Sequence, residues 1–353
     1  IRLMAYSTIP KGSLHMNPKT YTGTGSAMNI TGVGFQPDMT WIKPRSVVDN
    51  HILYDAVRGV SSRLIPNLNS AAGTVSDMVT SFNSDGVSLG TNGNVTANGV
   101  TFVAWNWKGG GTGVANTDGS VATTVSANTT AGFSIVSYTG NGDSNSTFGH
   151  GLGAVPTIFI TKKLTGANES WGVYADPLKT FVSAVNTRYL VLSNTGSYNN
   201  SSTVWNSTSP TNLHFTGGDN IANSAAPMIA YCFTPIKGFS KFGSYFGNNN
   251  SDGPMVYTGF KPSWVMIKRI DGANDWCIYD NKRDPFNVVQ DKLVANDSAA
   301  EGDDVALDFV SNGFKFRQNG GNFNGSYEYI YMCFAENPFV ATSGSDAVPV
   351  TAR

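Results

Sequence analysis

The sequence predicts an all-β protein made of tandem β-sandwich units of a jelly-roll-like kind. Charged residues make up 13% of the 353 residues, against about a quarter in an average soluble domain. Small polar residues supply the polarity instead, and the chain holds 39 Gly and 20 Phe. This composition is typical of short strands joined by many turns. Internal repeats and hairpin-type turns, described next, support the same fold class.

One strand-like string recurs three times along the chain. "GFQPDMTWIKPR" begins at Gly34, "GAVPTIFITKK" begins at Gly153, and "GFKPSWVMIKR" begins at Gly259. Repetition at this scale indicates that one supersecondary unit has been copied. Each string ends near a lysine, namely Lys43, Lys162 and Lys268. We interpret these lysines as residues at the edge of a core rather than as reactive groups.

The repeats divide the chain into three units with short additions. The predicted segments are an N-terminal extension (1–19), unit 1 (20–108), a Gly/Thr-rich linker (109–134), unit 2 (135–236), unit 3 (237–339) and a C-terminal tail (340–353). Within the linker, Gly109–Gly111 predicts a flexible break and the alternation in "SVATTVSAN" predicts one strand. The short connection "TPIKGFSKFGSYFG" predicts that units 2 and 3 share an interface.

Each unit carries its strand signals in the same order. A Tyr-containing strand comes first, then the Pro-led strand ending in Lys, then a strand ending in Tyr, and finally an aromatic closing strand. The closing strands "FVAWNW", "MIAYCF" and "YIYMCF" are apolar on both faces, which predicts central strands covered on both sides. Asp85-Gly86 and Asn312-Gly313 predict hairpin turns with positive φ.

Charge and cysteine content exclude several classes of function. Net charge is −1, so no strong field favours nucleic acid, and no apolar run predicts insertion in a membrane. Cys232, Cys277 and Cys333 are too few for a disulfide scaffold, and each lies in an apolar run. We interpret them as buried small hydrophobes.

No catalytic constellation is evident, and we expect a non-enzymatic protein without a cofactor. The four histidines lack metal-ligand spacing, and no nucleophile elbow or phosphate loop occurs. Asp55 and Asp280 recur at equivalent places, each followed three residues later by an arginine. Recurrence favours a structural Asp–Arg pair or Asx turn over a pair of catalytic carboxylates.

Two further sites are candidates for ligand binding. The acidic stretch with Asp297, Glu301, Asp303, Asp304 and Asp308 offers oxygen ligands for Ca²⁺, but it lacks EF-hand spacing, and a solvated acidic loop is the favoured interpretation. Trp205 and Tyr198 lie in polar segments and are candidates for glycan contact, since an aromatic face packs on a sugar ring. For Trp205 the core and ligand interpretations both stay open.

Several strings together resemble a known family. "HGLGAVPTIFITKK", "PMIAYCFTPIKGFSKFGSYFGN", "DGPMVYTGFKPSWVMIKR" and "DWCIYDNKRDPFN" are similar to an uncharacterised repeat-domain family of marine tailed bacteriophages, of the cyanophage and pelagiphage kind. The resemblance covers residues 135–339, and unit 1 is similar to a diverged copy. Members resemble virion structural and tail-fibre-like proteins, and they offer no catalytic residues to transfer.

The resemblance implies a structural protein of a phage virion, either a tail fibre, an appendage or a capsid decoration. Such a protein is made in the bacterial host cytoplasm and is located in the particle. Its expected partners are other virion proteins, further copies of itself and, as an added role, a host-surface glycan. The alternatives are a carbohydrate-binding module and a glycan depolymerase, the latter using Asp55 and Asp280.

Overall fold

The fold is all-β, as the composition predicted. The computed structural model describes residues 7–338. Within them lie 27 strands, two one-turn α-helices and three short 3-10 helices. The closing strands of the three units are rich in aromatic and apolar residues and are buried along nearly their whole length, as expected for strands covered on both faces.

Unit 1 contains a main sheet and a smaller second sheet. The main sheet has the order β1 (Met16–Thr22), β9 (Thr101–Trp107), β3 (Met39–Pro44), β4 (Ile52–Asp55), β5 (Gly59–Leu64) and β6 (Gly73–Thr74). The second sheet has the order β2 (Met28–Ile30), β8 (Gly86–Leu89) and β7 (Val79–Asn83), and α1 (Gly93–Thr96) follows it. Strand β1 begins within the segment expected as an N-terminal extension.

Unit 2 repeats this plan with two added strands. Its main sheet has the order β10 (Val114–Asn116), β11 (Thr123–Asn128), β12 (Phe133–Thr139), β19 (Pro227–Phe233), β14 (Ile158–Lys163), β15 (Gly172–Ala175), β16 (Arg188–Val191) and β17 (Asn199–Asn200). The second sheet pairs β13 (Ser146–Gly149) with β18 (His214–Gly217). Three short helices complete the unit: η2 (Asp176–Thr180), η3 (Val185–Thr187) and α2 (Asn220–Asn223).

Unit 3 joins its two sheets into one. The order is β20 (Ser240–Phe246), β27 (Glu328–Pro338), β22 (Phe260–Arg269), β23 (Trp276–Asp280), β24 (Val289–Val294), β25 (Gly302–Val310), β26 (Gly313–Phe316) and β21 (Met255–Tyr257). In all three units the closing strand lies between the first strand and the Lys-ended strand. The prediction that β9, β19 and β27 are central and covered is therefore confirmed.

Positive φ was predicted at two hairpin turns and is found at one glycine: φ is +146° at Gly86, whereas Gly313 has no positive φ. The hairpins form, but Gly86 and Gly313 are the first residues of their strands, paired with Asn83 and Val310. Among residues 7–338, neither preceding turn residue has positive φ. A Cβ on Gly86 would lie 1.9 Å from the carbonyl oxygen of Ile30, and one on Gly313 would lie 2.0 Å from that of Val256. Close approach of the neighbouring segment therefore requires glycine at both positions, and the positive φ of Gly86 requires it there as well.

The linker is more ordered than predicted. It holds two strands, β10 and β11, rather than one, and both join the sheet of unit 2. The predicted flexible break is held in place, because the Gly109 N–H donates to Asp38 and the Gly110 N–H donates to Ser126. The tail at 340–353 lies outside the described residues.

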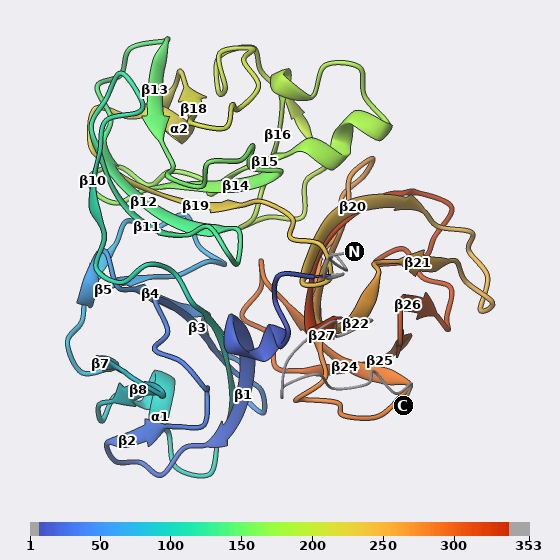
Figure 1. Cartoon of the computed structure of the whole chain (residues 1–353). Helices are drawn as coiled ribbons and strands as arrows, with labels where there is room; N and C mark the ends of the chain where they lie inside the picture. Colours follow the sequence, from blue (N-terminus) through green and yellow to red (C-terminus); the bar gives the residue numbers. More distant parts are fainter. Residues whose placement is uncertain (1–6, 339–353) are drawn as a thin grey trace, which may run out of the picture.

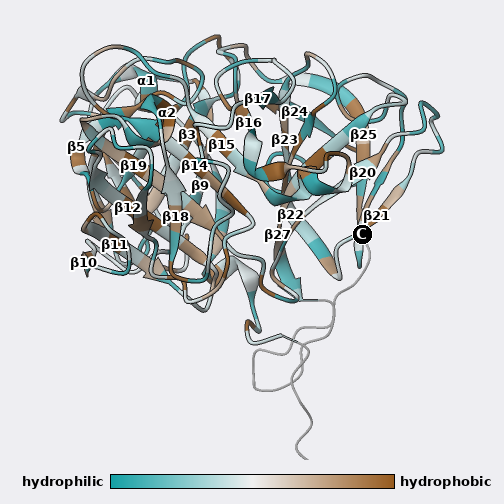
Figure 2. Cartoon of the chain, turned by 90° about the horizontal axis from the view of Figure 1, so that it is seen from above, coloured by the Kyte–Doolittle hydropathy of each residue, from teal (hydrophilic) through white to brown (hydrophobic). Residues whose placement is uncertain are grey.

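The three units are arranged around a common centre (Figure 1). One continuous apolar cluster takes side chains from all three main sheets, whereas two smaller clusters lie between the two sheets of unit 1 and of unit 2. In Figure 2 several strands alternate between hydrophobic and hydrophilic segments, as expected when one face of a strand points to a core. The predicted interface between units 2 and 3 is thus part of a larger shared core.

A small apolar space of about 20 Å³ lies at this centre. It is lined by side chains from each unit, among them Trp41, Ile160 and Met266, which occupy equivalent positions two residues before the repeated lysine. These three side chains differ in size and shape. Together they pack the centre closely, which three identical side chains would not do.

Candidate functional site: the junctions between units

Every pair of units meets at a junction built around the repeated lysine. Lys43, Lys162 and Lys268 are each 0% exposed, and each ammonium donates to a main-chain carbonyl of another unit. The acceptors are Ser298 at 3.2 Å, Asn69 at 3.0 Å and Thr195 at 2.8 Å, respectively. A second carbonyl of the lysine's own unit completes each site, from Pro44, Glu169 and Asn274. The lysines are therefore structural residues buried at the junctions.

Two main-chain hydrogen bonds repeat at each junction. In the first, the carbonyl of the other unit that accepts from the lysine ammonium also accepts a backbone N–H from the lysine's own unit. These donors are Asp49, Glu169 and Asn274, bonded to Ser298, Asn69 and Thr195. In the second, the residue three positions after that acceptor donates its backbone N–H back across the junction. The acceptor is the carbonyl two positions after the lysine. These pairs are Glu301 to Arg45, Ala72 to Leu164 and Tyr198 to Ile270.

A ring N–H provides a further contact across each junction. Trp171 Nε1 donates to the Leu68 carbonyl at 3.0 Å, and Trp276 Nε1 donates to the Val191 carbonyl at 3.0 Å. The equivalent residue in unit 1 is His51, whose Nε2 lies 2.9 Å from the Val294 carbonyl. Each of these rings lies three positions before the tyrosine of its strand, so the imidazole of unit 1 occupies the place of an indole in units 2 and 3.

The repeated contacts give the three junctions one direction. Unit 1 donates to unit 3, unit 2 donates to unit 1, and unit 3 donates to unit 2. Contacts that run head to tail in this way close on themselves after three steps. The single chain is therefore arranged like a cyclic trimer of its own repeat.

The predicted Asp–Arg pairs are confirmed as buried structural pairs. Arg58 Nε lies 2.6 Å from Asp55 Oδ2, and Arg283 Nε lies 2.6 Å from Asp280 Oδ2. In each pair the other carboxylate oxygen accepts the backbone N–H of the arginine. Burial raises the pKa of Asp280, but the charge and hydrogen bonds of Arg283 and the hydrogen bond from Trp105 outweigh it, so the net shift is downward.

Both aspartates also accept a hydrogen bond from a neighbouring unit. Tyr231 Oη of unit 2 donates to Asp55 of unit 1 at 2.7 Å, and Trp105 Nε1 of unit 1 donates to Asp280 of unit 3 at 2.9 Å. Trp105 and Tyr231 are equivalent residues of the closing strands, paired with Trp41 and Ile160. The aspartates therefore act within and between units at once.

At the third junction all three polar groups are replaced together. Ala175 stands where the aspartate would be, Leu178 where the arginine would be, and Met332 where the aromatic donor would be. All three side chains are buried in the shared core. Replacing a whole buried ion pair by apolar groups is tolerated, whereas removing one partner leaves an uncompensated charge.

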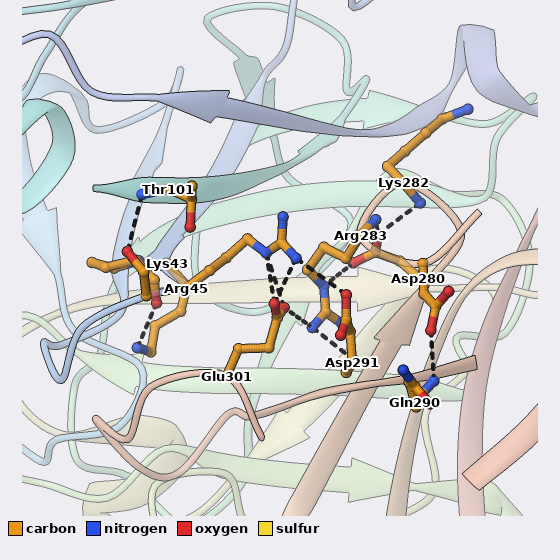
Figure 3. Close-up of polar contacts among 12 residues, drawn as sticks. Lys43, Arg45, Thr101, Asp280, Lys282, Arg283, Gln290, Asp291 and Glu301 are labelled. Atoms are coloured by element: carbon orange, nitrogen blue, oxygen red, sulfur yellow. Dashed lines mark hydrogen bonds and ion pairs between the residues drawn. The ribbon is translucent and has the colours of Figure 1, made fainter. Parts of the chain in front are cut away.

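The junction between units 1 and 3 holds an additional ion network (Figure 3). Arg45 of unit 1 reaches Glu301 at 2.6 Å and Asp291 at 3.1 Å. Glu301 also accepts from Arg283 at 2.8 Å. Burial and the neighbouring charge of Glu301 raise the pKa of Asp291 to about 6.

Of the acidic stretch expected to be a solvated loop or a Ca²⁺ site, Glu301 is part of this junction, and Asp303, Asp304 and Asp308 lie in strand β25. Glu301 lies between two guanidinium groups, and Asp304 pairs with Lys292. Asp297 accepts the backbone N–H of Ala299, and Asp308 pairs with Arg317 at 2.5 Å. Among residues 7–338, no group of three or more His, Cys, Asp or Glu side chains is placed to hold a metal ion.

The structure decides between the two interpretations of Trp205. Trp205 is 0% exposed, its Nε1 donates to the Arg188 carbonyl, and its ring packs edge-on against Phe159 and Tyr174. The core interpretation of this residue is therefore the right one, because its loop folds back over the second core of unit 2. Tyr198 is half-buried and stacks under the guanidinium of Arg188.

Sequence reasoning found the lysines, the Asp–Arg pairs and the buried cysteines, since all three cysteines are buried and unpaired. It missed Tyr231, Met332 and Ala175, although aligning the repeats by their lysines places the three strands in register. It also missed Arg45, because no repeat partner marks it.

The described part of the chain has no helix long and apolar enough to cross a membrane. A family model described as a domain of unknown function (DUF7483) matches residues 11–338. The chain belongs to the DUF7483 family. No curated protein matches it, and no solved structure does. Because the family match spans all three units, one DUF7483 domain corresponds to the whole ring rather than to a single repeat.

Proposed function

We propose that this DUF7483 protein is a non-enzymatic structural component of a tailed-phage virion, either a tail fibre or appendage or a capsid decoration. Its mechanism is assembly through the outer faces of its β-sandwich units, and contact with a host-surface glycan is an added role. The observation that supports it best is the closed ring of three β-units on one buried core. A ring of this kind is a rigid scaffold whose surface loops vary without loss of the core.

The repeated aspartates favour this proposal over a glycan depolymerase. Catalytic carboxylates must reach the substrate, but Asp55 and Asp280 are both 0% exposed and are neutralised by arginines. Their recurrence is accounted for by the junctions that they build.

Mass spectrometry of purified virions from the phage that encodes this chain tests the proposal. We expect the protein at stoichiometric abundance in the particle, and its absence from the particle would contradict the structural role. Antibody labelling in electron micrographs then distinguishes tail from capsid. A glycan array with the wild type and Tyr198→Ala tests the added role, because Trp205 is buried and its substitution would report on folding instead.

A further inference from the structure

We propose that the buried polar groups at the junctions determine the cyclic order of the three units, and that Trp105, Tyr231, Asp55 and Asp280 are the residues that set this specificity. The inference concerns recognition between units and does not rest on the proposed function. The main-chain and lysine contacts are the same at all three junctions, so they cannot distinguish one neighbour from another. The groups that differ between junctions are the only candidates among the contacts described above.

Three units joined in tandem can close in two cyclic orders. In the observed order Trp105 meets Asp280, Tyr231 meets Asp55, and Met332 stands opposite Ala175 by equivalence. Each junction is therefore matched, polar with polar and apolar with apolar.

The inverse order would mismatch two junctions of the three. Unit 1 would then dock on unit 2, placing Trp105 opposite Ala175, which has no acceptor. Unit 3 would dock on unit 1, placing Met332 opposite Asp55, which would lose its cross-junction donor. A buried polar group without its partner costs free energy, so both mismatches disfavour the inverse order.

The ion network adds to this discrimination. Arg45 faces Glu301 in the observed order. The residues equivalent to Glu301 in the other units are Ala72 and Tyr198, which carry no charge. In the inverse order Arg45 would face Tyr198, and Glu301 would lose one of its two guanidinium partners.

Pairs of engineered cysteines in the full-length chain report the order directly. Ala72→Cys with Leu164→Cys probes the observed order, because these two backbones are hydrogen-bonded at 2.8 Å across the junction of units 1 and 2. Ala72→Cys with Ile270→Cys probes the inverse order, because Ile270 is the unit 3 equivalent of Leu164. The chain is refolded under reducing conditions and then oxidised, and disulfide yield within and between chains is measured on non-reducing gels and by mass spectrometry. The natural cysteines are buried and 0% exposed.

Two sets of variants remove the discrimination in opposite ways. The first makes both polar junctions apolar by copying the third: Trp105→Met, Asp280→Ala, Arg283→Leu, Tyr231→Met, Asp55→Ala and Arg58→Leu are made together, with Arg45→Leu to remove the ion network. The second leaves both existing Asp–Arg pairs intact and adds a polar pair at the third junction, by Met332→Tyr, Ala175→Asp and Leu178→Arg. Made together with Arg45→Leu, which copies Leu164 and removes the ion pair across the junction of units 1 and 3, this variant is matched in both cyclic orders.

We expect the inverse-order disulfide to be at background in the wild type and to rise roughly tenfold for each mismatch that a variant removes. Lys179→Ala, which removes an exposed ion pair, is the control variant. It should leave the yield of the inverse-order disulfide at background. If the variant with apolar junctions fails to fold, the variant with the added polar pair at the third junction still tests the proposal. An inverse-order yield that stays at background in the folded variants would overturn the proposal and leave the polar groups with a purely stabilising role.

Discussion

The indole N–H of Trp41 donates to Nδ1 of His51 over 2.8 Å, while Nε2 of the same imidazole lies 2.9 Å from the Val294 carbonyl of unit 3. The imidazole must therefore accept at Nδ1 and donate at Nε2, which is the neutral form. Burial, followed by the charge of Lys43, lowers the pKa of His51 to about 3. In units 2 and 3 the same two positions hold Ile160 with Trp171 and Met266 with Trp276, which do not titrate.

Acid should weaken the wild-type protein through His51. In the unfolded chain this side chain binds a proton below about pH 6.5, but in the folded chain only below about 3, so stability is lost as pH falls through this window. The expected loss is about 1.4 kcal/mol for each pH unit. The double variant Trp41→Ile with His51→Trp copies unit 2 and should flatten this part of the profile. Chemical denaturation at pH 4 to 7 measures the difference from wild type, and parallel profiles would contradict the assignment.

Mild alkali should strengthen the protein through the junction lysines. Burial lowers the pKa values of Lys43, Lys162 and Lys268 to about 8, while the unfolded values stay near 10.5. Between these values the unfolded chain binds more protons, so the free energy of unfolding rises with pH, by about 1.4 kcal/mol per unit for each fully shifted lysine. The neutral amine keeps two N–H donors for its two carbonyls. Above about pH 10 buried tyrosines such as Tyr54, whose pKa burial raises to about 12, reverse the trend.

Lys268→Met tests the lysine effect against a matched background. The variant should be less stable at pH 7, because the Thr195 and Asn274 carbonyls lose their donor, and its stability should rise less steeply than that of the wild type between pH 8 and 10. Unfolding measured by tryptophan fluorescence across this range gives both slopes. Equal slopes would mean that the lysine stays charged in the folded protein.

Two nearby tryptophans on β9 should lose different amounts of stability on substitution by phenylalanine. Trp107 Nε1 is buried without a hydrogen-bond partner, and the equivalent residues Phe233 and Phe334 are already phenylalanines. Trp107→Phe should therefore change stability by less than about 1 kcal/mol. Trp105→Phe removes the donor to Asp280 and should cost about 1–3 kcal/mol. Equal effects in thermal and chemical unfolding would show that volume rather than hydrogen bonding dominates.

Breaking one buried ion pair should cost far more than breaking an exposed one. Arg283 and Asp280 are both fully buried, so Arg283→Met leaves a buried carboxylate without its cation and should cost about 3–5 kcal/mol. Lys179→Met breaks the pair with Asp176, in which the lysine side chain is 64% exposed, and should change stability by less than about 1 kcal/mol. Restoration of stability in Arg283→Leu with Asp280→Ala and Trp105→Met, which copies the third junction, would confirm the cause.

The repeats allowed much of this structure to be predicted. Equivalent lysines, aspartates and closing strands lie where the aligned sequence places them, because a repeated unit keeps its strand order and register. Individual side chains were harder to predict. Trp205 was open to two interpretations because a polar segment does not reveal whether its loop folds back on a core. Glu301 was expected in a solvated loop because its partners Arg45 and Arg283 come from different units.

The sequence by itself determined the fold class, the three repeats, the central closing strands and the structural role of the recurring Asp–Arg pairs, since periodicity and repetition are local properties of the chain. Only the tertiary structure decided that the three aromatic faces share one core and that Lys43, Lys162 and Lys268 each point into a neighbouring unit. These features depend on contacts between residues such as Lys43 and Ser298, which are 255 positions apart. Their pairing becomes apparent only when the units close around a common centre, because residues that meet at a junction lie far apart in the sequence.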